Sequence, residues 1–431
     1  MKKLFCLLFA LILITGCSVQ KNEEGVNVVR VGVWGTPEEM EIMNNVISEW
    51  EKTHPGIKIR LDHTNYPNYT NKILTQIAGG AAPDVISLEV EMFVNFVKKG
   101  VLEPLNDFMA NDTSFDIGDF FPKVIERFTV NDLLYSIPRD TAPFACVYYN
   151  KALFVKAGVP YPTDDWDWND MLDKAKKLTI PGQGNLMEQY GFYSWAWQNF
   201  VFSNGGQVVN DVDNPTTCLL DTPLALEGLK FYADLVNVHK VMPAPTAMSS
   251  IGMGIHSMFV AGKIAMFNSG IWETPILRKK TEVMAQKGER FDWDVVMFPK
   301  GPNGSRGFGT GGSGYAITKT SKNKKEAWEV IKALTGSDAQ ILLAKTGLAQ
   351  PANKKIADGE FWAQSKEMPL NKKMLNEAVN YVTYNPFDMN WAKALQLYVT
   401  PKLELVFNGK LDVKEAVDLF IQNVNELLQE E

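Results

Sequence analysis

The chain has 431 residues, of which 45% are hydrophobic, and a formal net charge of −7 at pH 7. At about 150 residues per domain, this length predicts two or three domains with sizeable cores. Because the chain is mildly acidic, we expect neither nucleic acid nor an anionic lipid surface among its partners.

The N-terminus has the pattern of a bacterial lipoprotein signal. Two lysines precede an apolar run over residues 4–14, which is too short to cross a bilayer of about 30 Å as a helix. The run ends in Ile14-Thr15-Gly16-Cys17, which resembles a lipobox, so we predict a cleaved signal peptide over residues 1–16 and a membrane-anchoring lipid on Cys17. Residues 17–26 are polar and are predicted to form a tether. The alternative is an ordinary signal peptide with a chance cysteine.

The residue after the lipobox and the remaining cysteines bear on localisation. In bacteria with an outer membrane, an aspartate after the lipidated cysteine usually retains a lipoprotein at the inner membrane. Ser18 therefore favours the extracellular face of a single-membrane cell, with the periplasm as the alternative. The mature chain also keeps Cys146 and Cys218. Because a lone pair far apart in sequence implies no disulfide framework, we predict two buried free thiols.

The first part of the mature chain predicts a β-α-β opening. A strand over residues 28–34 is followed by Thr36-Pro37-Glu38-Glu39, the pattern of a capped helix start. Residues 57–61 alternate as a second strand. A helix over about residues 69–78 and an apolar strand over 84–88 continue the pattern, which predicts a parallel sheet.

The alternation of strands and helices restarts further along the chain and predicts α/β architecture. Ser337 and Gln340 have the spacing of a capping box at the start of one of these helices. The predicted elements are a strand over 144–149, helices over 151–157 and 168–178, a helix opening at Pro223, and helices over 324–334 and 337–345.

Catalytic signatures are scarce. The chain has four histidines and no G-x-S-x-G, Walker A, H-E-x-x-H or C-x-x-C pattern, so we expect no metal, no cofactor and no triad enzyme. Residues 307–312 match G-x-G-x-x-G but precede the strand-like Tyr315-Ala316-Ile317, which argues against a dinucleotide site. Glu89 and Glu91 follow the end of a strand, where open α/β sheets place their ligands.

Four segments together resemble the extracellular solute-binding proteins of ABC importers, in the subgroup that includes maltose-binding proteins. They occur in the family's order and span nearly the whole mature chain. The segments are the G-x-x-P-D-V pattern of residues 80–85, residues 147–158, the F-x-x-G-K-x-A-M pattern of residues 259–266 followed by Gly270 and Trp272, and residues 311–317 with the helix that follows.

The resemblance implies a two-lobe periplasmic-binding-protein-like fold of type II, in which discontinuous α/β lobes are joined by crossing hinge strands and ligand is held between them. By analogy, residues 27–141 and 309–369 form lobe 1, and residues 142–308 and 370–431 form lobe 2. It also implies a monomeric binding protein rather than an enzyme, which hands its ligand to the transmembrane permease subunits of an importer.

The predicted ligand is a sugar, because a sugar ring presents apolar C–H faces for aromatic plates and hydroxyl edges for polar groups. Trp272 and Trp391 resemble the family's stacking tryptophans in position, and Asp140 resembles its acidic hydroxyl acceptor. For the tryptophans the alternative is core packing, which we predict for Trp168 and Trp328, and for Asp140 it is a structural pair with its neighbour. The full predicted ligand set is Trp34, Asn65, Tyr66, Glu89, Glu91, Asp140, Trp195, Trp197, Asn268, Gly270, Trp272, Gly311, Gly312, Ser313 and Trp391.

Two other functions stay open from the sequence. The same fold binds other solutes, such as a polyamine, a peptide or a metal complex, although a carboxylate cluster rather than tryptophans would then dominate the site. A secreted glycoside hydrolase with two catalytic carboxylates is the third hypothesis. The abundance of aromatic residues, 11% of the chain, favours an oligosaccharide.

Overall fold

The structure is a computed structural model that describes residues 25–182, 187–386 and 388–430. The predicted signal peptide, Cys17, Ser18 and most of the predicted tether lie outside these residues. Over the described part of the chain, no helix has the length and apolar character needed to cross a membrane.

The first lobe is built on a five-stranded sheet with the strand order β2-β1-β3-β15-β6. The parallel pairing predicted for the opening strands is confirmed, since β1 is parallel to both β2 and β3, whereas β15 is antiparallel to β3 and β6. The strands are β1 (Asn27–Val33), β2 (Ile57–His63), β3 (Val85–Glu89), β6 (Ile137–Pro138) and β15 (Ser313–Ile317).

Helices cover this sheet and bury one apolar core with it. The predicted cap of the first helix is confirmed, because the Glu39 N–H donates to the Thr36 hydroxyl and the Thr36 N–H donates to the Glu39 carboxylate. Trp328 belongs to this core, as predicted, and is 4% exposed. The covering helices are α1 (Pro37–Thr53), α2 (Tyr66–Ala78), α3 (Val90–Lys98), α5 (Pro122–Arg127), α13 (Lys324–Thr335) and α14 (Ser337–Thr346).

The second lobe is built on a four-stranded sheet with the order β11-β12-β8-β13. Its core contains Trp168, as predicted, and it buries Cys146 and Cys218 as free thiols, which confirms the cysteine prediction. The strands are β8 (Cys146–Asn150), β11 (Tyr193–Ser194), β12 (Met266–Ser269) and β13 (Trp293–Met297), and the main helices are α6 (Lys151–Ala157), α7 (Trp168–Leu178), α8 (Trp197–Ser203), α9 (Pro223–Asn237), α11 (Ile255–Val260), α12 (Thr274–Gln286), α17 (Met389–Ala394), α18 (Thr400–Phe407) and α19 (Val413–Leu428).

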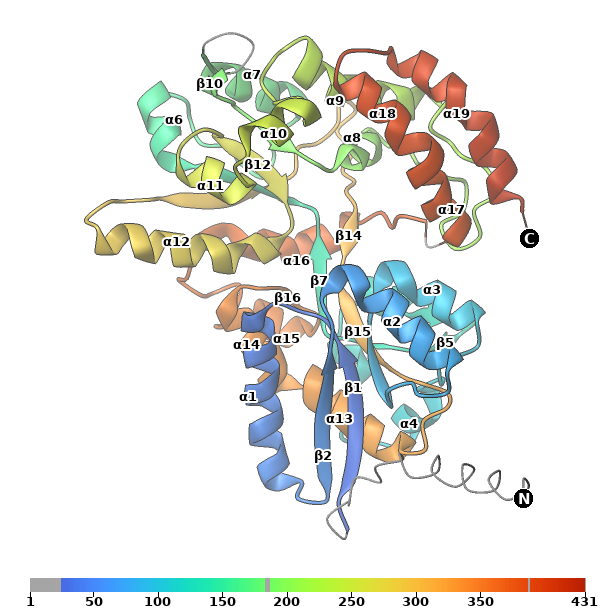
Figure 1. Cartoon of the computed structure of the whole chain (residues 1–431). Helices are drawn as coiled ribbons and strands as arrows, with labels where there is room; N and C mark the ends of the chain where they lie inside the picture. The colour runs from blue at the N-terminus through green and yellow to red at the C-terminus, as the bar shows by residue number, and fades with distance from the viewer. Residues whose placement is uncertain (1–24, 183–186, 387, 431) are drawn as a thin grey trace, which may run out of the picture.

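A short connecting sheet lies between the two lobes (Figure 1). Its central strand β7 (Asp140–Pro143) is antiparallel to β14 (Thr310–Gly311) and β16 (Gln350–Pro351). The segment 307–312 contains β14 and leads into the strand β15, whereas a dinucleotide fingerprint leads into a helix.

Gln340 connects α14 to this connecting sheet and explains why one sequence prediction is wrong. The predicted capping box at Ser337 is absent, because Gly336 is the N-cap of α14 and no side chain caps the helix. The fully buried Gln340 amide instead donates to the Arg139 carbonyl at 2.7 Å, and its oxygen accepts from the Asn353 N–H at 3.4 Å. The Gln340 amide stabilises the folded state more by satisfying two buried backbone groups than it would by capping an exposed helix end.

Candidate functional site

The central strand of the connecting sheet joins two groups of predicted ligand residues. Asp140 begins β7 at the first lobe, and Phe144 follows its last residue at the second lobe. At about 3.3 Å per residue, the Cα atoms at these two positions are about 13 Å apart. The two groups therefore lie at opposite ends of one short strand, in different lobes.

Three aromatic side chains form a cluster at the second-lobe end of β7, which we call the aromatic cluster: Phe144, Trp195 and Trp272. The Phe144 ring centroid lies 5.1 Å from that of Trp195 and 5.6 Å from that of Trp272, in edge-to-face geometry in both cases. Trp195 is 43% exposed, and Trp272 and Phe144 are half-buried. Large aromatic side chains that remain this exposed in a folded chain are available to a ligand.

Gly270 gives Trp272 its position. A Cβ atom built on Gly270 would lie 1.8 Å from the indole ring, so the ring can pack over this residue only because it is glycine. The structure thus gives Gly270 the role of making room for the Trp272 ring, and its predicted contact with ligand stays a prediction.

Asn268 is bonded to the backbone of the aromatic cluster through the carbonyl of Phe144. Its amide donates to the carbonyls of Phe144 at 2.9 Å and Cys146 at 3.1 Å, and its oxygen accepts from the Ser194 hydroxyl and the Asn199 amide. The Asn268 side chain is fully buried and its hydrogen bonds go to protein groups. It therefore holds the neighbouring backbone in place and is not exposed to a ligand.

A second group of predicted residues gathers at the first-lobe end of β7. Trp34 is 8% exposed and packs edge-on against Tyr66, with the ring centroids 6.0 Å apart. Tyr66 is 50% exposed, and its hydroxyl donates to Glu89 at 2.6 Å. Asn65 is an exposed N-cap of α2 whose side chain makes no cap hydrogen bond. The buried Trp34 ring therefore packs against Tyr66, and the hydrogen-bonded pair of Tyr66 and Glu89 remains accessible to solvent.

Glu89 has an unusual charge environment. Burial raises its pKa from 4.5 to about 7, the Tyr66 hydroxyl opposes the rise, and the nearby carboxylates of Glu91 and Asp140 add to it. Near neutral pH this side chain is thus present in both forms, one that only accepts hydrogen bonds and one that also donates. Glu91 itself is exposed and accepts from the Asn385 amide at 3.2 Å.

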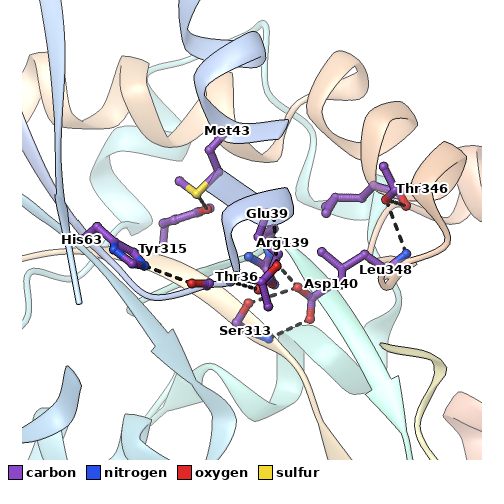
Figure 2. Close-up of polar contacts among 12 residues, drawn as sticks. Thr36, Glu39, Met43, His63, Arg139, Asp140, Ser313, Tyr315, Thr346 and Leu348 are labelled. Atoms are coloured by element: carbon purple, nitrogen blue, oxygen red, sulfur yellow. Dashed lines mark hydrogen bonds and ion pairs between the residues drawn. The ribbon is translucent and has the colours of Figure 1, made fainter. Parts of the chain in front are cut away.

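Asp140 lies inside the connecting sheet, and its carboxylate is occupied by protein groups. One oxygen accepts from the Ser313 N–H at 3.0 Å, and the other accepts from the Ser313 hydroxyl at 3.1 Å and from Arg139. Figure 2 shows Arg139 between this carboxylate and Glu39 of α1. With Asp140 only 3% exposed, the geometry favours the structural pair over a ligand contact.

The predicted glycines Gly311 and Gly312 lie beside Asp140, at the end of β14 and between β14 and β15. Gly312 has φ = +129°, and a Cβ there would meet the Asp140 carbonyl at 3.1 Å. Its own carbonyl accepts from the Val90 N–H at 3.1 Å, which joins β14 to the start of α3. Gly311 pairs with Ala142 in the connecting sheet, and Ser313 is 2% exposed.

Two predicted tryptophans lie with the core of the second lobe. Trp391 is 3% exposed on α17, and Trp197 is half-buried against the same core at the start of α8. The alternative of core packing therefore describes Trp391 in this structure. In contrast, Phe144 was not predicted, although an aromatic residue directly after a crossing strand is a usable signal for the site.

The described residues contain no group of three or more His, Cys, Asp or Glu side chains that could hold a metal ion. The candidate site contains aromatic faces, the Tyr66 hydroxyl, and the carboxyls of Glu89 and Glu91, whose pKa values are both raised by burial. Such a surface can bind and orient an uncharged polar solute.

The family model of the bacterial extracellular solute-binding proteins matches residues 34–341 of the chain, which is more than two thirds of it. The chain belongs to this family. As a member of the bacterial extracellular solute-binding protein family it is a binding protein of an ABC transport system and not an enzyme, and it has the α/β periplasmic-binding-protein fold.

Three similar proteins illustrate the relationship. The structure of the ABC substrate-binding protein of Listeria monocytogenes in complex with cycloalternan superposes with a TM-score of 0.81 at 25% identity, covering 94% of this chain and 100% of that chain. The arabinooligosaccharide-binding protein of Bacillus subtilis is 26% identical over 360 residues, covering 78% of this chain and 77% of the relative. An uncharacterized lipoprotein of Streptomyces antibioticus is 24% identical over 340 residues, covering 78% of this chain and 72% of the relative.

Proposed function

We propose that this solute-binding protein captures an oligosaccharide between its two lobes and delivers it to the permease subunits of an ABC importer. The observation that carries the proposal is the aromatic cluster, in which Trp195 is 43% exposed and Trp272 packs over a glycine. Indole faces suit the apolar C–H faces of sugar rings, and their exposure is otherwise unfavourable.

The Tyr66–Glu89 pair supplies the polar half of the proposed site. A hydroxyl and a carboxyl that are 2.6 Å apart can each exchange their mutual hydrogen bond for bonds to sugar hydroxyls. Because the Glu89 carboxyl is half-buried, its hydrogen bonds to ligand are stronger than at a fully open surface. This arrangement favours one hydroxyl configuration over its epimer.

The relatives support a sugar over other solutes. One similar structure holds the saccharide cycloalternan, and one relative is named for arabinooligosaccharides. A polyamine or metal complex would need several ionised carboxylates at the site, whereas Asp140 is already paired with Arg139 and the pKa of Glu89 is raised.

The lobe boundaries and the anchor are part of the proposal. We take residues 27–141 and 309–369 as lobe 1, residues 142–308 and 370–431 as lobe 2, and the connecting sheet as the hinge about which they close on ligand. A lipid on Cys17 would hold this monomer on the outer face of the cell membrane, beside its importer. One relative's description as a lipoprotein supports the anchor.

A thermal-shift screen against mono- and oligosaccharides, with polyamines and peptides in parallel, tests the proposal. A ligand at one hundred times its dissociation constant stabilises the folded state by about 2.7 kcal/mol, which is easily measured as a rise in melting temperature. A rise with oligosaccharides is the expected result. A rise only with a cationic or peptide solute would contradict the sugar assignment while leaving the family intact.

A further inference from the structure

An ion pair crosses between the two lobes. Arg127 lies at the end of α5, next to Val124 and Phe128 of the first core, and Asp213 lies in a loop between Val209 and Cys218 of the second core. The guanidinium and the carboxylate are 2.7 Å apart. The Arg127 side chain is 5% exposed, whereas that of Asp213 is 60% exposed.

The loop that carries Asp213 is held in shape by other side chains. The Asp211 carboxylate accepts from the N–H groups of Asp213 and Asn214 at 2.8 and 3.0 Å. The Asn210 amide oxygen accepts from the N–H groups of Thr216 and Thr217. Replacing the Asp213 side chain therefore leaves the hydrogen bonds that define the loop in place.

A second connection lies beside this ion pair. The segment after Val379, which packs in the first core, reaches Trp391 of the second core. Within it the Tyr384 hydroxyl donates to the Lys123 carbonyl at 2.8 Å, and the Arg127 guanidinium lies 5.0 Å above the Tyr384 ring. Arg127 is thus fixed on the first lobe, and Asp213 is the group that reaches it from across.

We propose that Arg127 and Asp213 are positioning residues for ligand retention, which hold the two lobes in the arrangement of this structure. The pair forms only when the two lobes are at this separation, so its free energy favours this arrangement whether or not ligand is present. A pair with one largely buried partner contributes more than an exposed pair and still weakens with salt. The effect on ligand retention rests on the proposed function, whereas the effect on the arrangement of the two lobes does not.

The test compares the wild type with Asp213→Asn, Asp213→Glu and a control, Asp165→Asn. Asp165 forms an ion pair with Lys300 inside the second lobe, so its variant loses the same charge without touching the other lobe. Small-angle X-ray scattering of the unliganded proteins measures the radius of gyration. Stopped-flow tryptophan fluorescence measures ligand association and dissociation rates for the saccharide that the thermal-shift screen identifies.

The expected result is a larger radius of gyration for Asp213→Asn and ligand dissociation about tenfold faster, with an association rate within about threefold of the wild type. Raising the salt concentration should move the wild type toward this variant and leave the variant unchanged. Asp213→Glu keeps the negative charge and should behave nearly like the wild type in both measurements. Asp165→Asn should match the wild type.

An equal radius of gyration for the wild type and Asp213→Asn would overturn the inference, as would an equal change in Asp165→Asn. If no saccharide binds, the proposed function fails, but the scattering comparison still decides whether Arg127 and Asp213 hold the lobes together.

Discussion

The two ends of β7 are built for different tasks. At the second-lobe end, Phe144, Trp195 and Trp272 stay partly exposed and meet one another by their edges. At the first-lobe end, Asp140 and Ser313 are almost completely buried and their polar groups are used by each other. The difference shows that side chains near one crossing strand divide into those that stay exposed to solvent, which we propose bind ligand, and those whose polar groups are used by other protein groups.

The largest effect on affinity is expected from the aromatic end. Replacing Trp272 by Ala removes one indole face, and the dissociation constant for the saccharide should rise about thirtyfold, equivalent to about 2 kcal/mol of lost aromatic contact. Isothermal titration calorimetry measures this change. The core variant Trp328→Phe is the control and should lower the melting temperature without changing affinity.

A smaller effect is expected when the ring is kept but displaced. In Gly270→Ala the new methyl group would overlap the Trp272 ring, so the ring must move, and affinity should fall about tenfold. Gly254→Ala is the matched control, because nothing lies within 4 Å of a Cβ at that position. Equal affinities for the two variants would show that the placement of Trp272 is unimportant.

At the polar pair, Glu89→Gln should reduce affinity only about threefold, since the amide still accepts a hydrogen bond. Its clearer effect is on pH dependence. A carboxyl whose pKa rises from 4.5 to about 7 on folding stabilises the folded state below pH 4.5, and this contribution is lost as the pH rises through 7.

Denaturant unfolding of the unliganded protein checks this sign. Relative to Glu89→Gln, the wild type should lose free energy of unfolding between about pH 4.5 and pH 7. The exposed Glu188→Gln variant serves as the control and should follow the wild type. Parallel curves for the wild type and Glu89→Gln would show that burial does not raise this pKa.

The smallest change in affinity is expected at Asp140. Replacing it with Asn leaves Arg139 buried beside a neutral amide, with Glu39 3.9 Å away as its other acidic partner, so stability should fall by about 2 kcal/mol. Affinity should change less than threefold, because the side chain is occupied by protein groups. A large loss of affinity without a loss of stability would instead assign Asp140 to the ligand.

Many elements of both lobes could be predicted from the sequence, because local signals and long-range packing agree in them. The Thr36 cap, the alternation of the opening strands and the end of α6 at the left-handed Gly158 are all local patterns. The capping box at Ser337 failed because Gln340 finds buried backbone partners that are distant in sequence.

The site was harder to predict because exposure is a property of the fold. In the sequence Trp391 resembles the family's stacking tryptophans and Trp195 does not, yet Trp195 is 43% exposed and Trp391 is 3% exposed. Phe144 has one sequence signal, its place directly after a crossing strand, and its contacts are with two tryptophans that lie 51 and 128 residues further along the chain. Asn268 looks like a ligand residue until its four protein partners are known.

A crystal structure of the protein with the saccharide that most raises its melting temperature is the decisive test of the proposed sugar site. We expect a sugar ring against the indole of Trp272 or Trp195, with a hydroxyl of the same ligand bonded to Tyr66 or Glu89. A saccharide bound with both tryptophans uncovered would contradict it.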